Sequence, residues 1–100
     1  MSFSTTKLSS DDIVQSLASL SGWSLSEGKL HREYHFGNFA EAFDFMSAAA
    51  IVVEELNHHP EWSNCYDKVV IDLVSHDAGG VTKLDLKLAE RFDALAKKMA

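Results

Sequence analysis

The segment of residues 39–56 constrains the fold most, because its apolar residues recur at helical spacing in two rows. One row contains Phe39, Phe43, Met46, Ala50 and Val53, and the other contains Ala42, Phe45, Ala49, Val52 and Leu56. One row can cover a sheet, whereas the second row needs another surface. Two interpretations stay open: a helix that associates with another copy of the chain, or a helix wedged between two elements of its own chain.

Both ends of this helix have recognisable signals. Asn38 and Glu41 form a capping pair at the start. Pro60 disfavours helical geometry at His59, so the helix should end near residue 57 or 58.

The residues on either side predict two hairpins and two further helices. Strand patterns cover residues 23–25 and 30–36, and again residues 62–66 and 69–75. A first helix should begin around residues 8–12 and end at residues 21–22, and a capping box from Thr82 to Asp85 should open a last helix. The order α-β-β-α-β-β-α indicates the α+β class, an antiparallel sheet with helices on one face.

Length and composition narrow the class further. One hundred residues indicate a single domain over residues 1–100, of which we expect residues 1–7 to be disordered. A net charge of -6 argues against direct binding to nucleic acid. The longest apolar run, residues 48–53, is too short to span a membrane, and the N-terminus lacks a secretory signal. We therefore expect a soluble, cytoplasmic protein. Its only cysteine, Cys65, excludes an internal disulfide and is expected to be buried.

The strongest functional signal is a group of histidines and carboxylates. His58 and His59 stand just before the proline, His76 follows the last strand pattern, and Glu54 and Asp85 supply carboxylates. Histidine is the side chain whose ordinary pKa suits proton transfer near neutral pH. Glu54 and His58 are four residues apart, so on a continuous helix they would share a face and could pair.

Each of these residues also has a purely structural interpretation. Glu54 and His58 could be a surface pair, His59 a turn residue, Asp85 a capping partner and Trp62 part of the core. A zinc site is disfavoured, because adjacent histidines rarely face one ion and no HxH, HExxH or CxxC spacing is present. His31 and His35 alternate along a strand pattern and are expected to face solvent.

The chain resembles the pterin-4a-carbinolamine dehydratase family. The resemblance is carried by the motif Glu54-x-x-x-His58-His59-Pro60-x-Trp62, followed by Tyr66, Ser75-His76-Asp77 and Asp85. It extends beyond the motif, from Phe36-Gly37-Asn38-Phe39 as far as Leu88-Ala89.

This resemblance implies a fold and a reaction. The fold has four antiparallel strands with three helices on one face. The substrate is a 4a-hydroxytetrahydropterin, the products are quinonoid dihydropterin and water, and no metal or organic cofactor takes part. By position, His58, His59 and His76 would be the catalytic imidazoles. Glu54 would orient His58, and Asp85 would orient His76 or bind substrate, with Trp62 and Ser75 as further substrate-binding residues.

The resemblance also implies partners. Family members in animals form tetramers through the long helix and act as a dimerisation cofactor for hepatocyte nuclear factor 1, a homeodomain factor. A homodimer or homotetramer is therefore expected, and a nuclear location is a second expectation. The alternative to an enzyme is a protein-interaction module that acts through its long helix.

Overall fold

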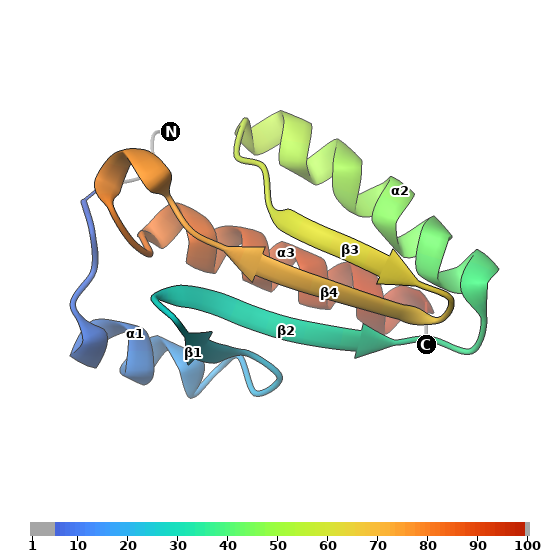
Figure 1. The fold of residues 1–100 in the computed structure, drawn as a ribbon, viewed down its shortest axis with the longest axis horizontal. Helices are drawn as coiled ribbons and strands as arrows, with labels where there is room; N and C mark the ends of the chain where they lie inside the picture. Colours follow the sequence, from blue (N-terminus) through green and yellow to red (C-terminus); the bar gives the residue numbers. More distant parts are fainter. Residues whose placement is uncertain (1–5, 100) are drawn as a thin grey trace.

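The computed structural model describes residues 6–99, which form three α-helices and a four-stranded sheet (Figure 1). The elements in chain order are α1 (Ser10–Leu17), β1 (Ser24–Ser26), β2 (Lys29–His35), α2 (Phe39–Leu56), β3 (Glu61–Cys65), β4 (Lys68–Leu73), the short 3-10 helix η1 (His76–Ala78) and α3 (Lys83–Met99). The predicted order and the α+β class are confirmed. The expectation of disorder at the N-terminus falls mainly on residues 1–5, which lie outside the described part of the chain.

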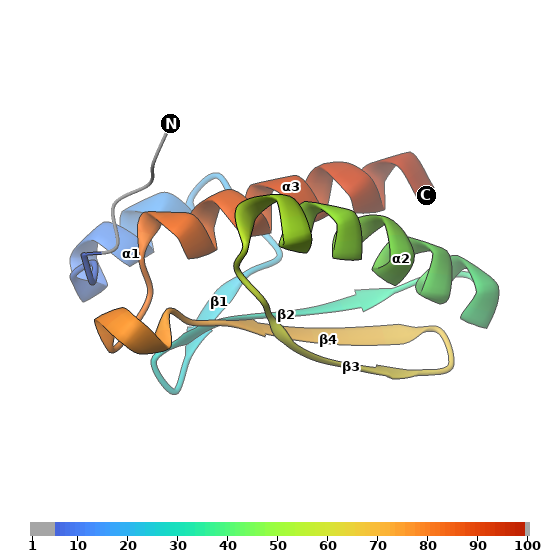
Figure 2. The same ribbon diagram turned by 90° about the horizontal axis from the view of Figure 1, so that it is seen from above.

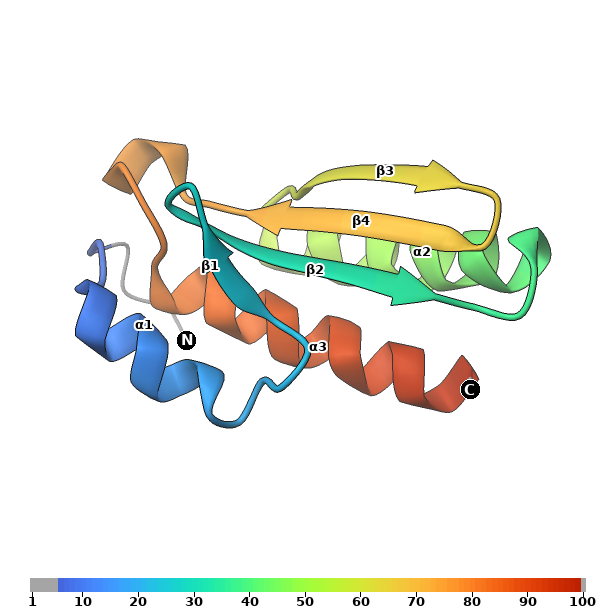
Figure 3. The same cartoon turned by 60° about the horizontal axis from the view of Figure 1, so that its bottom comes forward.

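The sheet is antiparallel throughout, with the strand order β1-β2-β4-β3. All three helices lie on one face of it (Figure 2), and β1 forms the edge beside β2, opposite β3 (Figure 3). Alternate residues of each central strand face the helices, and among them Leu30 in β2 and Ile71 in β4 are fully buried. The intervening residues form a polar open face, because side chains alternate along a strand.

Two sequence expectations concern this open face. His31 and His35 lie on it, with side chains 31% and 63% exposed, and both contact Glu33. Cys65, however, is exposed, so the expectation of a buried thiol is wrong. Trp62 and Asn64 take the positions of β3 that face the helices, and the period of two therefore places Cys65 on the open face.

Helix α2 buries only one side of its wide apolar surface. Ala42, Phe45 and Ala49, which belong to one of its two apolar rows, are fully buried against α3 and the sheet. Phe39 and Phe43, by contrast, stay about half exposed, at 48% and 54%. The interpretation of a helix covered on both sides by its own chain therefore does not hold for these two side chains within residues 6–99.

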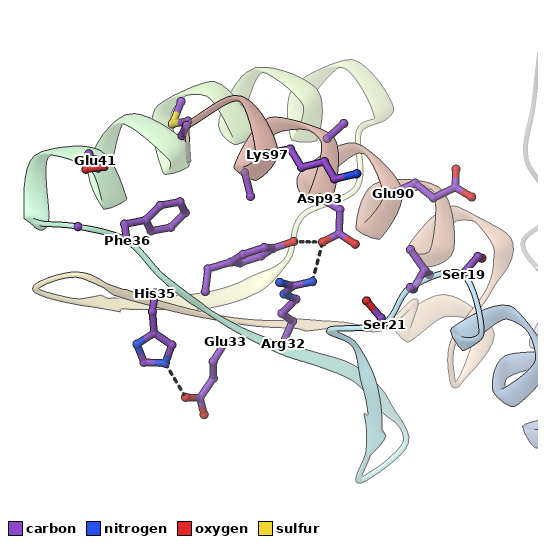
Figure 4. A pocket seen from close by; sticks show the side chains of 16 residues that line it. Ser19, Ser21, Arg32, Glu33, His35, Phe36, Glu41, Glu90, Asp93 and Lys97 are labelled. Carbon is purple, nitrogen blue, oxygen red and sulfur yellow. Dashed lines mark hydrogen bonds and ion pairs between the residues drawn. The ribbon is translucent and has the colours of Figure 1, made fainter.

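A polar cluster joins β2 to α3 beside the core. Asp93 Oδ1 accepts hydrogen bonds from Trp23 Nε1 at 3.0 Å, from Arg32 Nη1 at 3.1 Å and from the Tyr34 hydroxyl. The Arg32 guanidinium also lies over the Tyr34 ring, 4.2 Å from its centroid. Arg32, Tyr34 and Asp93 line a cavity of about 1010 Å³ between β2 and α3, and Figure 4 shows Arg32 and Asp93 on its wall.

Tyr34 makes the stability of the fold sensitive to alkaline pH. Burial, and then the hydrogen bond to Asp93, raise the pKa of its hydroxyl far above 10. The folded state therefore holds this proton at pH values where the unfolded chain releases it, so the stabilisation is complete below pH 10 and falls above it. In the wild type we expect Tyr34 to lower the free energy of unfolding by about 1.4 kcal/mol for each pH unit above pH 10. This decrease should be absent in Tyr34→Phe. Urea unfolding at several alkaline pH values measures this slope, and Tyr66→Phe, at an exposed tyrosine, is the control. An unchanged slope in Tyr34→Phe would contradict the expectation.

Candidate active site

The predicted site residues lie where four elements meet at one end of the sheet. Helix α2 ends there and leads into β3, while β4 runs out through η1 to the start of α3 (Figure 1). Glu61 at the start of β3 pairs in register with Asp72 near the end of β4. The fold therefore brings the segments around residues 58, 61, 76 and 85 to the same end of the molecule.

The end of α2 sets the directions of the two adjacent histidines. Asn57 adopts a left-handed conformation with φ of 49°. Its N–H donates to the Glu54 carbonyl at 3.2 Å, and the His58 N–H donates to the Val53 carbonyl at 3.1 Å. This is the hydrogen-bond pattern of a Schellman motif, which ends a helix and turns the chain away from its axis. His58 and His59 consequently leave the helix with different surroundings.

His58 points to a buried carboxylate. Its Nε2 lies 2.5 Å from Asp85 Oδ1, and the Asp85 side chain is completely buried. The second oxygen, Asp85 Oδ2, accepts from the Thr82 N–H and from the Ser75 hydroxyl, each at 2.8 Å. A carboxylate held by several donors is a rigid partner that can fix the orientation and tautomer of an imidazole.

The loop between β4 and α3 holds this cluster in place. Ser75 and Gly80 form an isolated bridge, in which the Ser75 N–H donates to the Gly80 carbonyl at 2.9 Å. Gly79 has φ of 77°, a conformation that an L side chain rarely adopts. The Thr82 hydroxyl accepts from the Leu84 N–H at 3.3 Å, so the predicted capping box at the start of α3 is confirmed.

The other two histidines are exposed, and each contacts its own carboxylate. His59 Nε2 lies 2.7 Å from Glu54 Oε2, and His76 Nε2 lies 3.0 Å from Glu61 Oε2. Their side chains are 60% and 75% exposed, against 14% for His58. Each of the three imidazoles therefore has a separate carboxylate partner.

These contacts correct two predicted pairings. Glu54 contacts His59, not His58, because the left-handed Asn57 ends the helix before His58 can take the next helical position. Asp85 contacts His58, not His76, because the first turn of α3 faces the end of α2 inside the protein.

The two predicted substrate-binding residues, Ser75 and Trp62, lie in different surroundings. Ser75 belongs to the buried cluster, where its hydroxyl contacts both Asp85 and Thr82 Oγ1, the latter at 2.9 Å. Trp62 faces the helices and stacks on Phe92 of α3, with ring centroids 6.3 Å apart and planes 17° from parallel. Its contact with a substrate stays a prediction.

Sequence reasoning missed Glu61 and its second partner, Lys29. Lys29 Nζ lies 2.6 Å from Glu61 Oε1. The hydrogen bond from Lys29, and then that from His76, lower the pKa of the Glu61 carboxyl group. Pairing the strand patterns across the predicted turn would have placed Glu61 beside the residues that follow β4, but the contact from Lys29, two strands away, has no sequence signal.

The site has no metal-binding geometry within residues 6–99, where no three His, Cys, Asp or Glu side chains gather around a common point. The cavity beside Asp93 is lined by none of the three site histidines, so it is separate from this site. No helix among the described residues has both the length and the apolar character needed to cross a membrane.

Comparisons with known sequences give one consistent result. Residues 6–95 match the family model described as Pterin 4 alpha carbinolamine dehydratase. A protein from Solibacter usitatus is 53% identical over 92% of this chain and 97% of its own length. One from a strain of Prochlorococcus marinus is 51% identical over 88% of this chain and 92% of its own length. Both carry the name "Putative pterin-4-alpha-carbinolamine dehydratase".

Two solved structures share the fold. A transcriptional coactivator/pterin dehydratase from Brucella melitensis is 39% identical, with a TM-score of 0.88 over 91% of this chain and 99% of that chain. A pterin dehydratase-like protein identified as a RuBisCO assembly factor in the alpha-carboxysome is 28% identical, with a TM-score of 0.62 over 74% of this chain and 86% of that chain.

Proposed function

The chain belongs to the pterin-4-alpha-carbinolamine dehydratase family, and from this membership we propose that it is an active dehydratase acting on a 4a-hydroxytetrahydropterin, such as 4a-hydroxytetrahydrobiopterin. The observation that carries the proposal is the set of three imidazoles at one end of the fold, each beside its own carboxylate. A protein that only binds a partner has no need for such a set. The reaction would serve the recycling of tetrahydrobiopterin and would need no cofactor.

The reaction needs one proton acceptor and one proton donor. The base removes the proton from N5 of the pterin, and the electron pair of the N5–H bond forms the C4a–N5 double bond as the C4a–O bond breaks. The acid protonates the departing hydroxyl group, which leaves as water. Each positioned acid or base typically contributes about 10²–10⁴ to the rate.

The contacts suggest a role for each histidine. We assign the proton exchanges to His58 and His76, and the positioning of the pterin ring to His59. Asp85 would orient His58, and Glu54 would orient His59, in agreement with the distances of 2.5 Å and 2.7 Å. Ser75 would act by holding Asp85, to which its hydroxyl donates.

We also propose that the exposed apolar residues of α2 bind a second copy of this chain. Phe39 and Phe43 lie with their rings 5.7 Å apart, and Ile51 further along the helix is 64% exposed. Exposed apolar side chains on a long helix are typical of a helix-bundle interface. The same face could hold a different partner in an interaction module, which is the alternative function.

The association can be tested at one residue. We expect Phe43→Asp to convert a dimeric or tetrameric species into a smaller one, because a charge would be buried in the interface. Sedimentation velocity over a range of protein concentrations measures the change. Glu55→Gln, an exposed position on the same helix that leaves Phe39 and Phe43 intact, is the control. A monomeric wild-type chain would contradict this proposal.

The enzymatic proposal is tested by generating a 4a-hydroxytetrahydropterin and following its dehydration spectroscopically, with and without the protein. We expect saturable acceleration over buffer. A rate equal to that in buffer would contradict the proposal and favour the interaction module. The cytoplasmic location expected from the sequence stays a prediction.

A further inference from the structure

Glu61 joins two side chains from different parts of the fold through its two oxygens. Oε1 lies 2.6 Å from the Lys29 ammonium group of β2, and Oε2 lies 3.0 Å from His76 Nε2 of η1. Glu61 itself is the first residue of β3. None of these contacts involves the buried cluster around Asp85.

The strand register explains why Lys29 and Glu61 meet on the open face. Lys29 precedes Leu30, which pairs with Leu73 and faces the helices, so Lys29 faces the other way. Glu61 precedes Trp62 and is likewise turned to the open face. Asp72 of β4 pairs in register with Glu61, and its Oδ1 lies 2.8 Å from His31 Nδ1.

The charges of this group fix which nitrogen of His76 carries a proton. Hydrogen bonds from Lys29 and His76 lower the pKa of Glu61 below its ordinary value of 4.5, so Glu61 is a carboxylate at neutral pH. The same contact with Glu61 raises the pKa of Lys29, which is therefore an ammonium group. A carboxylate has no proton to donate and can only accept. His76 Nε2 must consequently be the donor, and in the neutral ring Nδ1 has the free electron pair.

We infer that Lys29 and Glu61 are positioning residues for His76, and that His76 takes up and releases a proton at Nδ1 when it reacts with the pterin. The inference rests on the proposed function. Lys29 neutralises and holds the Glu61 carboxylate, and that carboxylate holds the imidazole ring. His76 is 75% exposed, and without Glu61 its ring would be free to rotate in solvent. A misplacement of about 1 Å in a catalytic group can lower a rate by about 10².

Steady-state kinetics of three variants tests the positioning. We expect Glu61→Ala to lower kcat by about 10- to 100-fold with KM changed less than about threefold, because the ring is misplaced while pterin binding continues. Lys29→Met should lower kcat by a smaller factor, because Glu61 remains but is no longer held. Glu33→Gln is the matched control: Glu33 has the same 46% side-chain exposure as Glu61 and contacts His31 and His35 on the same face, and its kcat should stay unchanged.

A double-variant comparison separates positioning from a general structural role. If Glu61 acts through His76, then Glu61→Ala should have no further effect on kcat in a His76→Ala background. If the factors by which the two single substitutions lower kcat multiplied in the double variant, the inference would be overturned. A Glu61→Ala enzyme with the kcat of the wild type would also overturn it. A wild-type chain that does not accelerate dehydration would overturn the proposed function and this inference with it.

The assignment of the reacting atom has a readout that does not use activity. In ¹⁵N spectra of the neutral His76 ring, Nε2 should show the shift of a protonated nitrogen and Nδ1 that of an unprotonated nitrogen. In Glu61→Ala the two shifts should move toward each other as both tautomers become populated. The opposite tautomer in the wild type, or unchanged shifts in Glu61→Ala, would overturn the assignment.

Discussion

Replacing His76 with alanine should lower the turnover number for loss of water from a 4a-hydroxytetrahydropterin by a factor of roughly 10²–10⁴, the usual contribution of one acid or base. The His76 side chain is 75% exposed and contacts the exposed Glu61, so its removal should leave the free energy of unfolding within about 0.5 kcal/mol of the wild-type value. The measurements are kcat by rapid mixing and stability by urea unfolding, on the same preparation.

The matched control for this variant is His35→Ala. His35 is also an exposed histidine, with a side chain 63% exposed, but it lies at the far end of β2 and contacts Glu33. Its turnover should equal that of the wild type. If His76→Ala and His35→Ala had the same turnover, His76 would have no part in the mechanism.

Replacing Asp85 with alanine should destabilise the fold by about 3–5 kcal/mol, the usual result of removing one partner of a buried pair. The Asp85 carboxylate is fully buried and holds three partners: the Thr82 N–H, the Ser75 hydroxyl and the His58 ring. Without it the buried Thr82 N–H would lack its partner, the Ser75 hydroxyl would keep only Thr82 Oγ1, and His58 would lose its orientation. Turnover should therefore fall together with stability, unlike in His76→Ala.

Two variants make this expectation specific. Asp85→Asn keeps an oxygen that can accept from the Thr82 N–H, so it should lose about half as much stability as Asp85→Ala and still lose turnover. Asp77→Ala removes an exposed carboxylate from the neighbouring η1 and should cost no more than about 0.5 kcal/mol. An Asp85→Ala protein as stable as Asp77→Ala would contradict the role of Asp85 as the centre of the cluster.

Local signals in the sequence predicted the elements well. The capping pairs at Asn38 and Thr82 mark the starts of α2 and α3, and Pro60 marks the region where α2 has ended. The exposure of Phe39 and Phe43 follows from an apolar arc too wide for one contact. These features depend on residues within a few positions of one another.

The partners of the three histidines could not be predicted in the same way. The i, i+4 rule predicted a contact between Glu54 and His58. The left-handed residue Asn57 ends the helix before His58, and Glu54 contacts His59 instead. The contact between His58 and Asp85 spans 27 positions in sequence, and that between Lys29 and Glu61 spans 32. Such contacts depend on strand order and on the packing of α3 against α2, which no local pattern specifies.

The most direct test compares the wild-type chain with the His58→Ala/His76→Ala double variant in the dehydration assay, at equal protein concentration. We expect the wild type to accelerate loss of water from the 4a-hydroxytetrahydropterin, and the double variant, folded by circular dichroism, to show the same rate as buffer. A folded double variant that retains the wild-type rate, or a wild type no faster than buffer, would contradict the claim that these imidazoles carry the reaction.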